Sequence, residues 1–242
     1  GTSFSNDASS TSVGSVDSAG SVNTDAGFSI IGYTGDAQTG TTIAHGLGVK
    51  PNMIILKNRE PDTANWQVYH SSLGATYYVQ LNSTGAATDS NTRWNDVEPT
   101  STVFTTGSSG DVCGDSSGET FIAYCFAEIK GYSKIASYTG NGAAEGPFCY
   151  TGFKPAFVII KRTDATNDWV LLDNKRDSFN VANTKLFSSN SDGDVTSQNA
   201  CDFVSNGFKS RDSATNAFAT NVSGATYIFM AFAENPFVTS TG

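Results

Sequence analysis

The strongest constraint on the fold is an internal repeat that runs through most of the chain. The segment 50–57 begins with Lys-Pro, continues as a short apolar run and returns at 154–161. The apolar segment 120–128 returns at 226–234, and the Tyr-Thr-Gly step at Tyr33 also returns about 105 residues later. Anchors in the same order at one spacing predict two copies of one unit. A period this long is typical of duplicated domains rather than of solenoid repeats.

Within each copy the pattern predicts strands. The runs after Lys-Pro are β-branched and apolar, and proline there sets the start of a strand without removing an interior hydrogen-bond donor. Segments 120–128 and 226–234 are nearly continuously apolar, which is typical of strands buried on both faces. Asn-Gly and Asp-Gly steps between the runs favour tight hairpins. We therefore predict an all-β fold of two tandem β-sandwich units, each of about seven strands.

Residues 1–27 differ from both copies. They are rich in Ser, Thr and Gly, and Phe4 is their single aromatic residue. Such a segment buries too little apolar surface to offset the entropy lost on ordering. We expect a flexible linker or an extended arm ordered by a partner, and the abrupt start at Gly1 indicates a fragment of a longer polypeptide. Copy 1 then spans 28–130 and copy 2 spans 131–242.

Charge and composition argue against several functions. The chain has 14 Lys and Arg against 23 Asp and Glu, a net charge of −9, so we expect no nucleic-acid binding. Its longest apolar runs, 121–127 and 227–233, are too short to cross a bilayer as a helix, which takes about 20 residues. Four cysteines and two histidines are too few for a disulfide scaffold or a zinc site of usual spacing. Cys125 fits a small buried thiol, while the other three cysteines remain open to pairing in an oxidising compartment.

The residues that could support catalysis favour structural roles. His45 and His70 both lie in copy 1, so neither recurs as the base that a nucleophile needs. Glu128 and Glu234 recur in both copies but end the apolar runs, where a carboxylate pairs with a nearby lysine or backbone amide. Glycoside hydrolysis would need a second matched carboxylate in each copy. The nearest ones are Asp62 and Asp164. We expect no enzyme.

One polar stretch predicts a ligand site. Trp94 has no equivalent in copy 2, and its neighbours Arg93, Asn95 and Asp96 are hydrogen-bonding side chains. An indole ring flanked by such groups suits stacking on a sugar ring, with hydrogen bonds to its hydroxyls. We predict ligand contact at these four residues, and the alternative is a tryptophan that anchors its own loop. The recurring tryptophans of the Asn-Trp and Asp-Trp pairs are expected in the core.

Two acidic, Gly-containing loops carry oxygen ligands suited to Ca²⁺, at 111–118 and 192–194. Neither has the spacing of an EF-hand, and Asp-Gly is ordinary turn chemistry. We therefore expect no metal site and no cofactor, with Ca²⁺ as the one alternative left open.

Several short sequence motifs, taken together, resemble those of a known group of proteins. They include His-Gly-Leu-Gly at 45–48, Tyr-Cys-Phe-Ala-Glu at 124–128, Tyr-Thr-Gly-Phe-Lys-Pro at 150–155 and Ala-Phe-Ala-Glu-Asn-Pro-Phe at 231–237. The combination resembles a duplicated domain at the C-terminal end of virion and tail-associated proteins of tailed bacteriophages, many of them marine. The resemblance covers about residues 1–238 and carries over no catalytic residues.

This resemblance implies a jelly-roll sandwich like those of concanavalin and SPRY domains. It further implies a non-enzymatic structural or adhesion module of a virion, of the tail-fibre or receptor-binding type, assembled in the host cytoplasm and without membrane insertion. The implied partners are other virion subunits, host cell-surface polysaccharide and further copies of the chain, with a trimer expected by analogy. The alternatives are a purely structural part, such as a head decoration or tail-wall subunit, and a polysaccharide-degrading enzyme.

Overall fold

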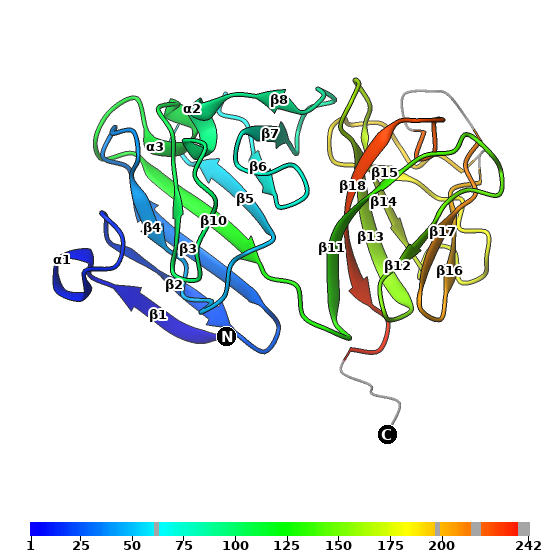
Figure 1. Ribbon diagram of the computed structural model, residues 1–242, viewed down its shortest axis with the longest axis horizontal. Coiled ribbons are helices and arrows are strands. Elements are labelled where there is room, and N and C mark those ends of the chain that lie inside the picture. Colours follow the sequence, from blue (N-terminus) through cyan, green and yellow to red (C-terminus); the bar gives the residue numbers. More distant parts are fainter. Residues whose placement is uncertain (61–62, 197–198, 214–218, 237–242) are drawn as a thin grey trace. The chain divides into compact units, whose positions relative to one another are not determined.

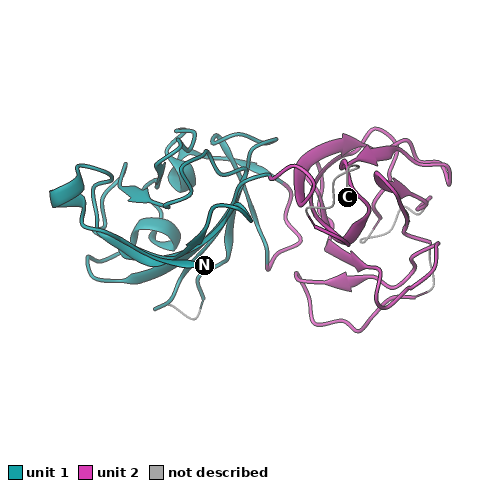
Figure 2. Ribbon diagram, turned by 90° about the horizontal axis from the view of Figure 1, so that it is seen from below, with its two compact units in different colours: residues 1–81, 87–128 teal, residues 82–86, 129–242 magenta. Residues whose placement is uncertain are grey.

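The computed structural model describes residues 1–60, 63–196, 199–213 and 219–236, and strands dominate it. The chain divides into two compact units (Figure 2): unit 1 comprises residues 1–81 and 87–128, and unit 2 comprises residues 82–86 and 129–242. The predicted all-β class is confirmed. Helices in the described part have only four residues each, and none could span a membrane. They are α1 (Ala8–Thr11), α2 (Asn91–Trp94) and α3 (Gly110–Cys113).

Unit 1 is built on an eight-stranded antiparallel sheet in the order β1-β2-β3-β10-β5-β6-β7-β8 (Figure 1). Strands β4 and β9 form a second, two-stranded sheet. The strands are β1 (Thr2–Asn6), β2 (Ser18–Asn23), β3 (Phe28–Thr34), β4 (Thr42–Ala44), β5 (Met53–Asn58), β6 (Gln67–His70), β7 (Tyr77–Gln80), β8 (Thr88–Asp89), β9 (Val103–Thr105) and β10 (Thr120–Phe126).

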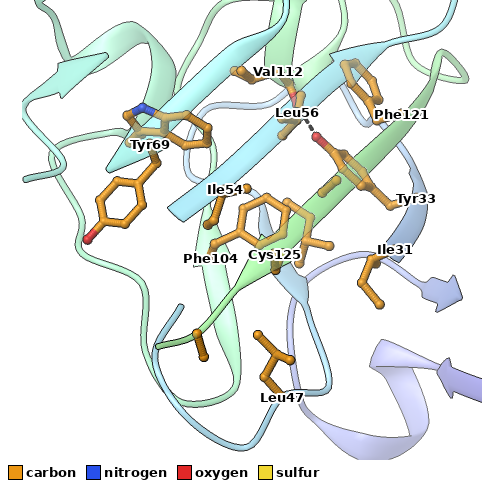
Figure 3. Close-up of a cluster of buried hydrophobic side chains, with 14 of the residues drawn as sticks. Ile31, Tyr33, Leu47, Ile54, Leu56, Tyr69, Phe104, Val112, Phe121 and Cys125 are labelled. Carbon is orange, nitrogen blue, oxygen red and sulfur yellow. Dashed lines mark hydrogen bonds between the residues drawn. The ribbon is translucent and has the colours of Figure 1, made fainter. Parts of the chain in front are cut away.

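Alternation along β3 and β10 sets the core of unit 1. Ile31, Tyr33 and Phe121 point inward and are buried, and they share one apolar cluster with Phe104 of β9 (Figure 3). The large sheet and the small one therefore pack face to face, as the two layers of a sandwich do. The buried Tyr33 hydroxyl has a hydrogen-bond partner, because it donates to the Val112 carbonyl at 2.6 Å. The outward residues of β10 are only half-buried, so the prediction of burial on both faces was wrong for this strand.

Unit 2 also has two antiparallel sheets, in the orders β11-β18-β13-β14-β15 and β12-β17-β16. Side chains from both sheets share one apolar cluster. Its strand β18 has five consecutive buried residues, so here the prediction of burial on both faces is confirmed. The strands are β11 (Ser133–Thr139), β12 (Phe148–Tyr150), β13 (Pro155–Arg162), β14 (Trp169–Asp173), β15 (Leu186–Phe187), β16 (Cys201–Val204), β17 (Gly207–Ser210) and β18 (Thr226–Ala233).

The repeated sequence anchors occupy matching places in the two units. The order β3-β10-β5-β6 of unit 1 corresponds to β11-β18-β13-β14 of unit 2. Tyr33 stacks on Phe121, and Tyr138 stacks on Tyr227, with ring centres 4.9 Å apart in both pairs. The Tyr138 hydroxyl donates to the Thr220 carbonyl at 2.6 Å, as the Tyr33 hydroxyl donates to the carbonyl of Val112 in α3. The anchors thus place an aromatic pair at the same point of each sheet, while the ancestral doubling itself stays a prediction.

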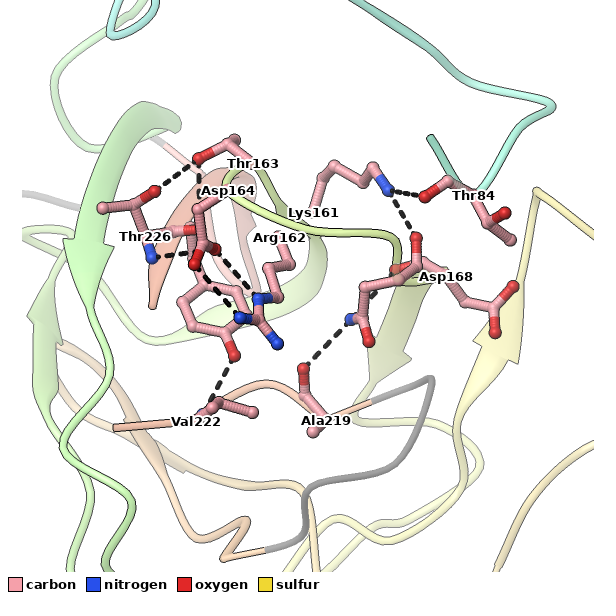
Figure 4. A network of polar contacts seen from close by, with 11 residues as sticks. Thr84, Lys161, Arg162, Thr163, Asp164, Asp168, Ala219, Val222 and Thr226 are labelled. Atoms are coloured by element: carbon pink, nitrogen blue, oxygen red, sulfur yellow. Dashed lines mark hydrogen bonds and ion pairs between the residues drawn. The ribbon is translucent and has the colours of Figure 1, made fainter. Parts of the chain in front are cut away.

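The lysines that end the Lys-Pro segments have one role in both units. Lys57 Nζ donates to the Ala64 carbonyl at 2.7 Å. Lys161, which is fully buried, donates to the carbonyl of Asn167 and, at 2.9 Å, to that of Thr84 (Figure 4). Buried ammonium groups need such acceptors, because an unsatisfied one is costly. In unit 2 this contact ties the segment 82–86 to the sheet.

Residues 1–27, predicted as a flexible linker or an extended arm ordered by a partner, are instead paired with a strand of the same chain. Strand β2 pairs with β3 from Ser18 opposite Tyr33 to Asn23 opposite Phe28, and β1 pairs with β2. The segment is therefore part of unit 1. Hydrogen bonds to the edge of β3 supply the ordering that the composition lacks, and the few apolar side chains, among them Val22, turn toward the core.

Candidate functional site

Trp94, the centre of the predicted ligand site, is a core residue. The ring is 1% exposed and meets Tyr69 edge to face at 6.0 Å between centroids. It ends the one-turn helix α2, whose N-cap Ser90 accepts the Thr92 amide. A ring enclosed in this way cannot stack on a sugar. The prediction of ligand contact at Trp94 was therefore wrong, and the alternative of a loop-anchoring tryptophan holds.

Its three neighbours serve the same local fold. The Arg93 guanidinium lies 4.6 Å from the centre of the Tyr78 ring, and its Nη2 lies 3.4 Å from Asp111 Oδ2. These contacts hold α2 against β7 and α3. Asn95 and Asp96 both have left-handed backbone conformations, with φ of 53° and 54°, and they turn the chain away from α2. The structure does not gather the four predicted residues on one binding surface.

The histidines and cysteines are buried structural groups. His45 is fully buried, its Nδ1 accepts the Leu47 amide at 3.2 Å, and burial lowers its pKa. His70 is also buried, and its Nδ1 accepts the Ser72 amide at 3.1 Å. The structural role expected of both is confirmed. All four cysteines are free and buried, and burial raises the pKa of the Cys125 thiol to about 12.

Two of the four candidate carboxylates, Glu234 and Asp164, are held in ion pairs. Glu234 lies 2.8 Å from Lys154 Nζ and accepts the Asn174 amide at 2.8 Å. Asp164 lies 2.9 Å from Arg162 (Figure 4). Asp62 lies outside the described residues. Within the described ranges no three side chains of His, Cys, Asp or Glu gather as a metal site would require.

A different surface presents aromatic side chains to solvent. Phe148 and Tyr150 are 49% and 63% exposed and lie two residues apart on β12, the edge strand of the three-stranded sheet. Phe148 pairs with Lys209 and Tyr150 with Gly207, so all four lie on the outer face. Asp202 pairs with Lys209 from the other side. We call these five residues the aromatic face.

A network of charges borders the aromatic face. Glu145 accepts hydrogen bonds from both Lys209 and Arg211, and Arg211 Nε lies 3.4 Å from Asp202 Oδ2. The contacts with Lys209 and then Arg211 lower the pKa of Glu145. The cations thereby hold fixed positions beside the two rings. Exposed rings next to oriented donors and acceptors form a surface suited to an amphipathic ligand.

The shared fold does not require these rings. The strand pairs align the two copies, since Cys149 lies opposite Phe208 as Ile43 lies opposite Phe104. Phe148 and Tyr150 therefore correspond to Thr42 and Ala44 of unit 1. The signal in the sequence was two aromatic residues flanking a cysteine in a short strand, at positions where the other copy has small residues.

Comparison with known proteins gives one match. Residues 3–236 match the family described as "Domain of unknown function (DUF7483)". The chain belongs to this family. The match spans both units and includes β1 and β2, in keeping with their place in the sheet of unit 1. No curated protein and no solved structure matches the chain. Membership of this family assigns no function to the chain.

Proposed function

We propose that this chain is a non-enzymatic, saccharide-binding adhesion module of a bacteriophage virion, and that its aromatic face contacts host surface polysaccharide. The observation that carries the proposal is the pair Phe148 and Tyr150, exposed side by side beside a fixed set of charges. The virion setting rests on the resemblance given above.

The chemistry of a sugar ring matches the aromatic face. A pyranose has an apolar face of C–H groups and a rim of hydroxyls. The C–H face packs on an aromatic ring, while the hydroxyls form hydrogen bonds with charged side chains such as Lys209 and Asp202. Phe and Tyr lose little conformational freedom on binding because each has only two side-chain torsions. Such contacts are individually weak, so several copies of the chain, as in the trimer expected by analogy, would raise the avidity.

A purely structural role in the virion is the second candidate. An exposed aromatic pair also suits burial against a neighbouring virion subunit. A polysaccharide-degrading enzyme has less support, because Glu234 and Asp164 are held by Lys154 and Arg162 rather than facing each other across a cleft. Binding without turnover separates the first proposal from both of these.

Binding to host polysaccharide fractions tests the proposal. The full chain is passed over immobilised capsule and envelope polysaccharides, and Phe148→Ala and Tyr150→Ala are compared with Tyr77→Ala, an exposed tyrosine of unit 1. We expect each aromatic-face variant to lose about tenfold in affinity, or about 1.4 kcal/mol, the size of effect seen when a contact aromatic is truncated. Tyr77→Ala should bind normally. Equal binding by all three variants would contradict the proposal. Release of reducing ends would favour the enzyme, and binding only to virion subunits the structural role.

A further inference from the structure

A row of charged and hydroxyl side chains crosses the outer face of the sheet of unit 1. Thr34 of β3 lies opposite Thr120 of β10, and both point away from the core. Arg59 continues the row beyond Thr120, since its amide bonds to the Thr120 carbonyl at 2.9 Å. On the other side Asp17 and then Asp7 continue it, one position beyond the pairs Ser18–Tyr33 and Asn6–Ser18. The row thus reads carboxylate, carboxylate, hydroxyl, hydroxyl, guanidinium.

The row borders a groove of about 410 Å³. Ala19 and Gly32, which face each other on β2 and β3, form its low floor. A Cβ on Gly32 would meet no atom nearer than 3.6 Å, so the space above the floor is open. The volume lies in the range of small-molecule sites. Asp7 and Asp17, which line one side of the groove, belong to the segment 1–27. The groove therefore exists only because that segment pairs with β3.

The charges at the two ends are available to a ligand. Among the described residues no side chain pairs with the Arg59 guanidinium. Asp17 Oδ1 accepts a hydrogen bond from the Ala8 amide at 2.9 Å. Asp7 Oδ1 accepts hydrogen bonds from the Ser9 hydroxyl and the Ser10 amide. Within the described ranges, no hydrogen bond reaches the second oxygen of either aspartate. The row therefore offers two carboxylates at one end and, at the other, the Arg59 guanidinium beside the carboxylate of Glu60.

The spacing of the ends defines the length of the ligand. Asp17 leads into β2 and Arg59 follows β5, and β3 and β10 lie between them. Neighbouring strands are about 4.8 Å apart, so the backbones of the two residues are separated by about 14 Å. A disaccharide fits such a span, with hydroxyl groups reaching the Thr34 and Thr120 side chains. Glu60 fixes the rim beside Arg59 because its carboxylate accepts both the amide and the hydroxyl of Thr120 at 2.9 Å.

We propose that this groove binds a saccharide segment of about two rings that carries a free amino group and a carboxylate. The ammonium group pairs with Asp7 and Asp17, and the carboxylate takes the planar fork of Arg59. The choice of a saccharide rests on the proposed function. The site, its residues and the charges it selects are separate from the aromatic face.

Calorimetry with a glucosaminyl-glucuronate disaccharide tests this proposal on the full chain. The matched probes are its N-acetylated form, which lacks the positive charge, and its methyl ester, which lacks the negative charge. We expect the unmodified disaccharide to bind about fivefold more tightly than either, the ratio that one exposed charge pair provides. Asp17→Asn should weaken the preference over the N-acetylated form only, because Asp7 remains, and Arg59→Gln should abolish the preference over the ester only.

Tyr77→Ala serves as the control and should keep both preferences, because Tyr77 is exposed and lies in neither the groove nor the aromatic face. If the three probes bind the wild type equally, or if the Asp17 and Arg59 variants keep the same preferences, the groove proposal is wrong whatever the aromatic face does. If the preferences hold but Phe148→Ala and Tyr150→Ala still bind polysaccharide normally, the groove stands and the aromatic face is not the adhesion surface. Both groove variants change exposed side chains, and an unaltered thermal midpoint verifies that they fold.

Discussion

The ion pair of Lys185 and Asp212 provides the sharpest test of the packing in unit 2. The two charged groups lie 2.7 Å apart, with side-chain exposures of 0% and 1%. Asp212 also accepts the Thr220 amide at 3.0 Å. Lys185→Met would leave the carboxylate buried without its cation, which costs about 3–5 kcal/mol. With a urea dependence of about 2 kcal/mol per molar, the midpoint of unit 2 should fall by about 2 M.

Buried thiols report the unfolding of each unit separately. Cys201 lies in the core of unit 2 and Cys125 in that of unit 1, and both are free and fully shielded. Burial raises the pKa of both thiols, so alkylation followed by mass spectrometry detects each only when its unit opens. Lys185→Met should advance the labelling of Cys201 and leave that of Cys125 unchanged.

The double variant Lys185→Met/Asp212→Asn supplies the control. A neutral amide keeps an acceptor for Thr220 and removes the uncompensated charge, so most of the lost stability should return. The reasoning is refuted if the single variant costs less than about 1 kcal/mol, or if the double variant is no more stable than the single one.

One further perturbation should lower the stability of unit 1, and another should raise the stability of unit 2. Trp94→Ala should destabilise unit 1 by about 3–5 kcal/mol, because it leaves a cavity in the core. The folded variant should bind polysaccharide as the wild type does. A selective loss of binding would instead support a ligand role for Trp94. Burial lowers the pKa of Lys161 to about 8 from an ordinary value of 10.5. Between those values the unfolded chain holds a proton that the folded one lacks, so unit 2 should gain stability as the pH rises from about 8 to 10.5. Urea midpoints across that range should show the gain in the wild type, and Lys161→Met should lose it.

The repeat predicted the central strands of both units because hydrophobic pattern and turn chemistry are local properties. The Lys-Pro segments became β5 and β13, and the long apolar runs became β10 and β18. Strands β1 and β2 could not be predicted in this way, because their side chains carry little apolar area. The segment 1–27 is ordered instead by backbone pairing to the edge of β3. That edge exists only once the sheet has formed.

The ligand prediction failed for a related reason. A tryptophan among polar neighbours looks the same in sequence whether its ring points outward or inward. In α2 one turn of helix aims the ring of Trp94 into the core and leaves the polar residues outside. The exposed rings of Phe148 and Tyr150 lie in a short strand that reads as ordinary core. Solvent exposure depends on which segments cover a strand, and those segments are distant along the chain.

By itself the sequence determined the all-β class, the two-unit plan, the acidic surface and the strands that carry the repeat, because each follows from residue type and spacing. Only the tertiary structure decided that the first 27 residues complete the sheet of unit 1, that Trp94 is enclosed, and that an aromatic face and a charged groove meet solvent. Strand partners and burial are relations between residues far apart in the chain. They are settled when the sheets pair and pack, and no local pattern encodes them.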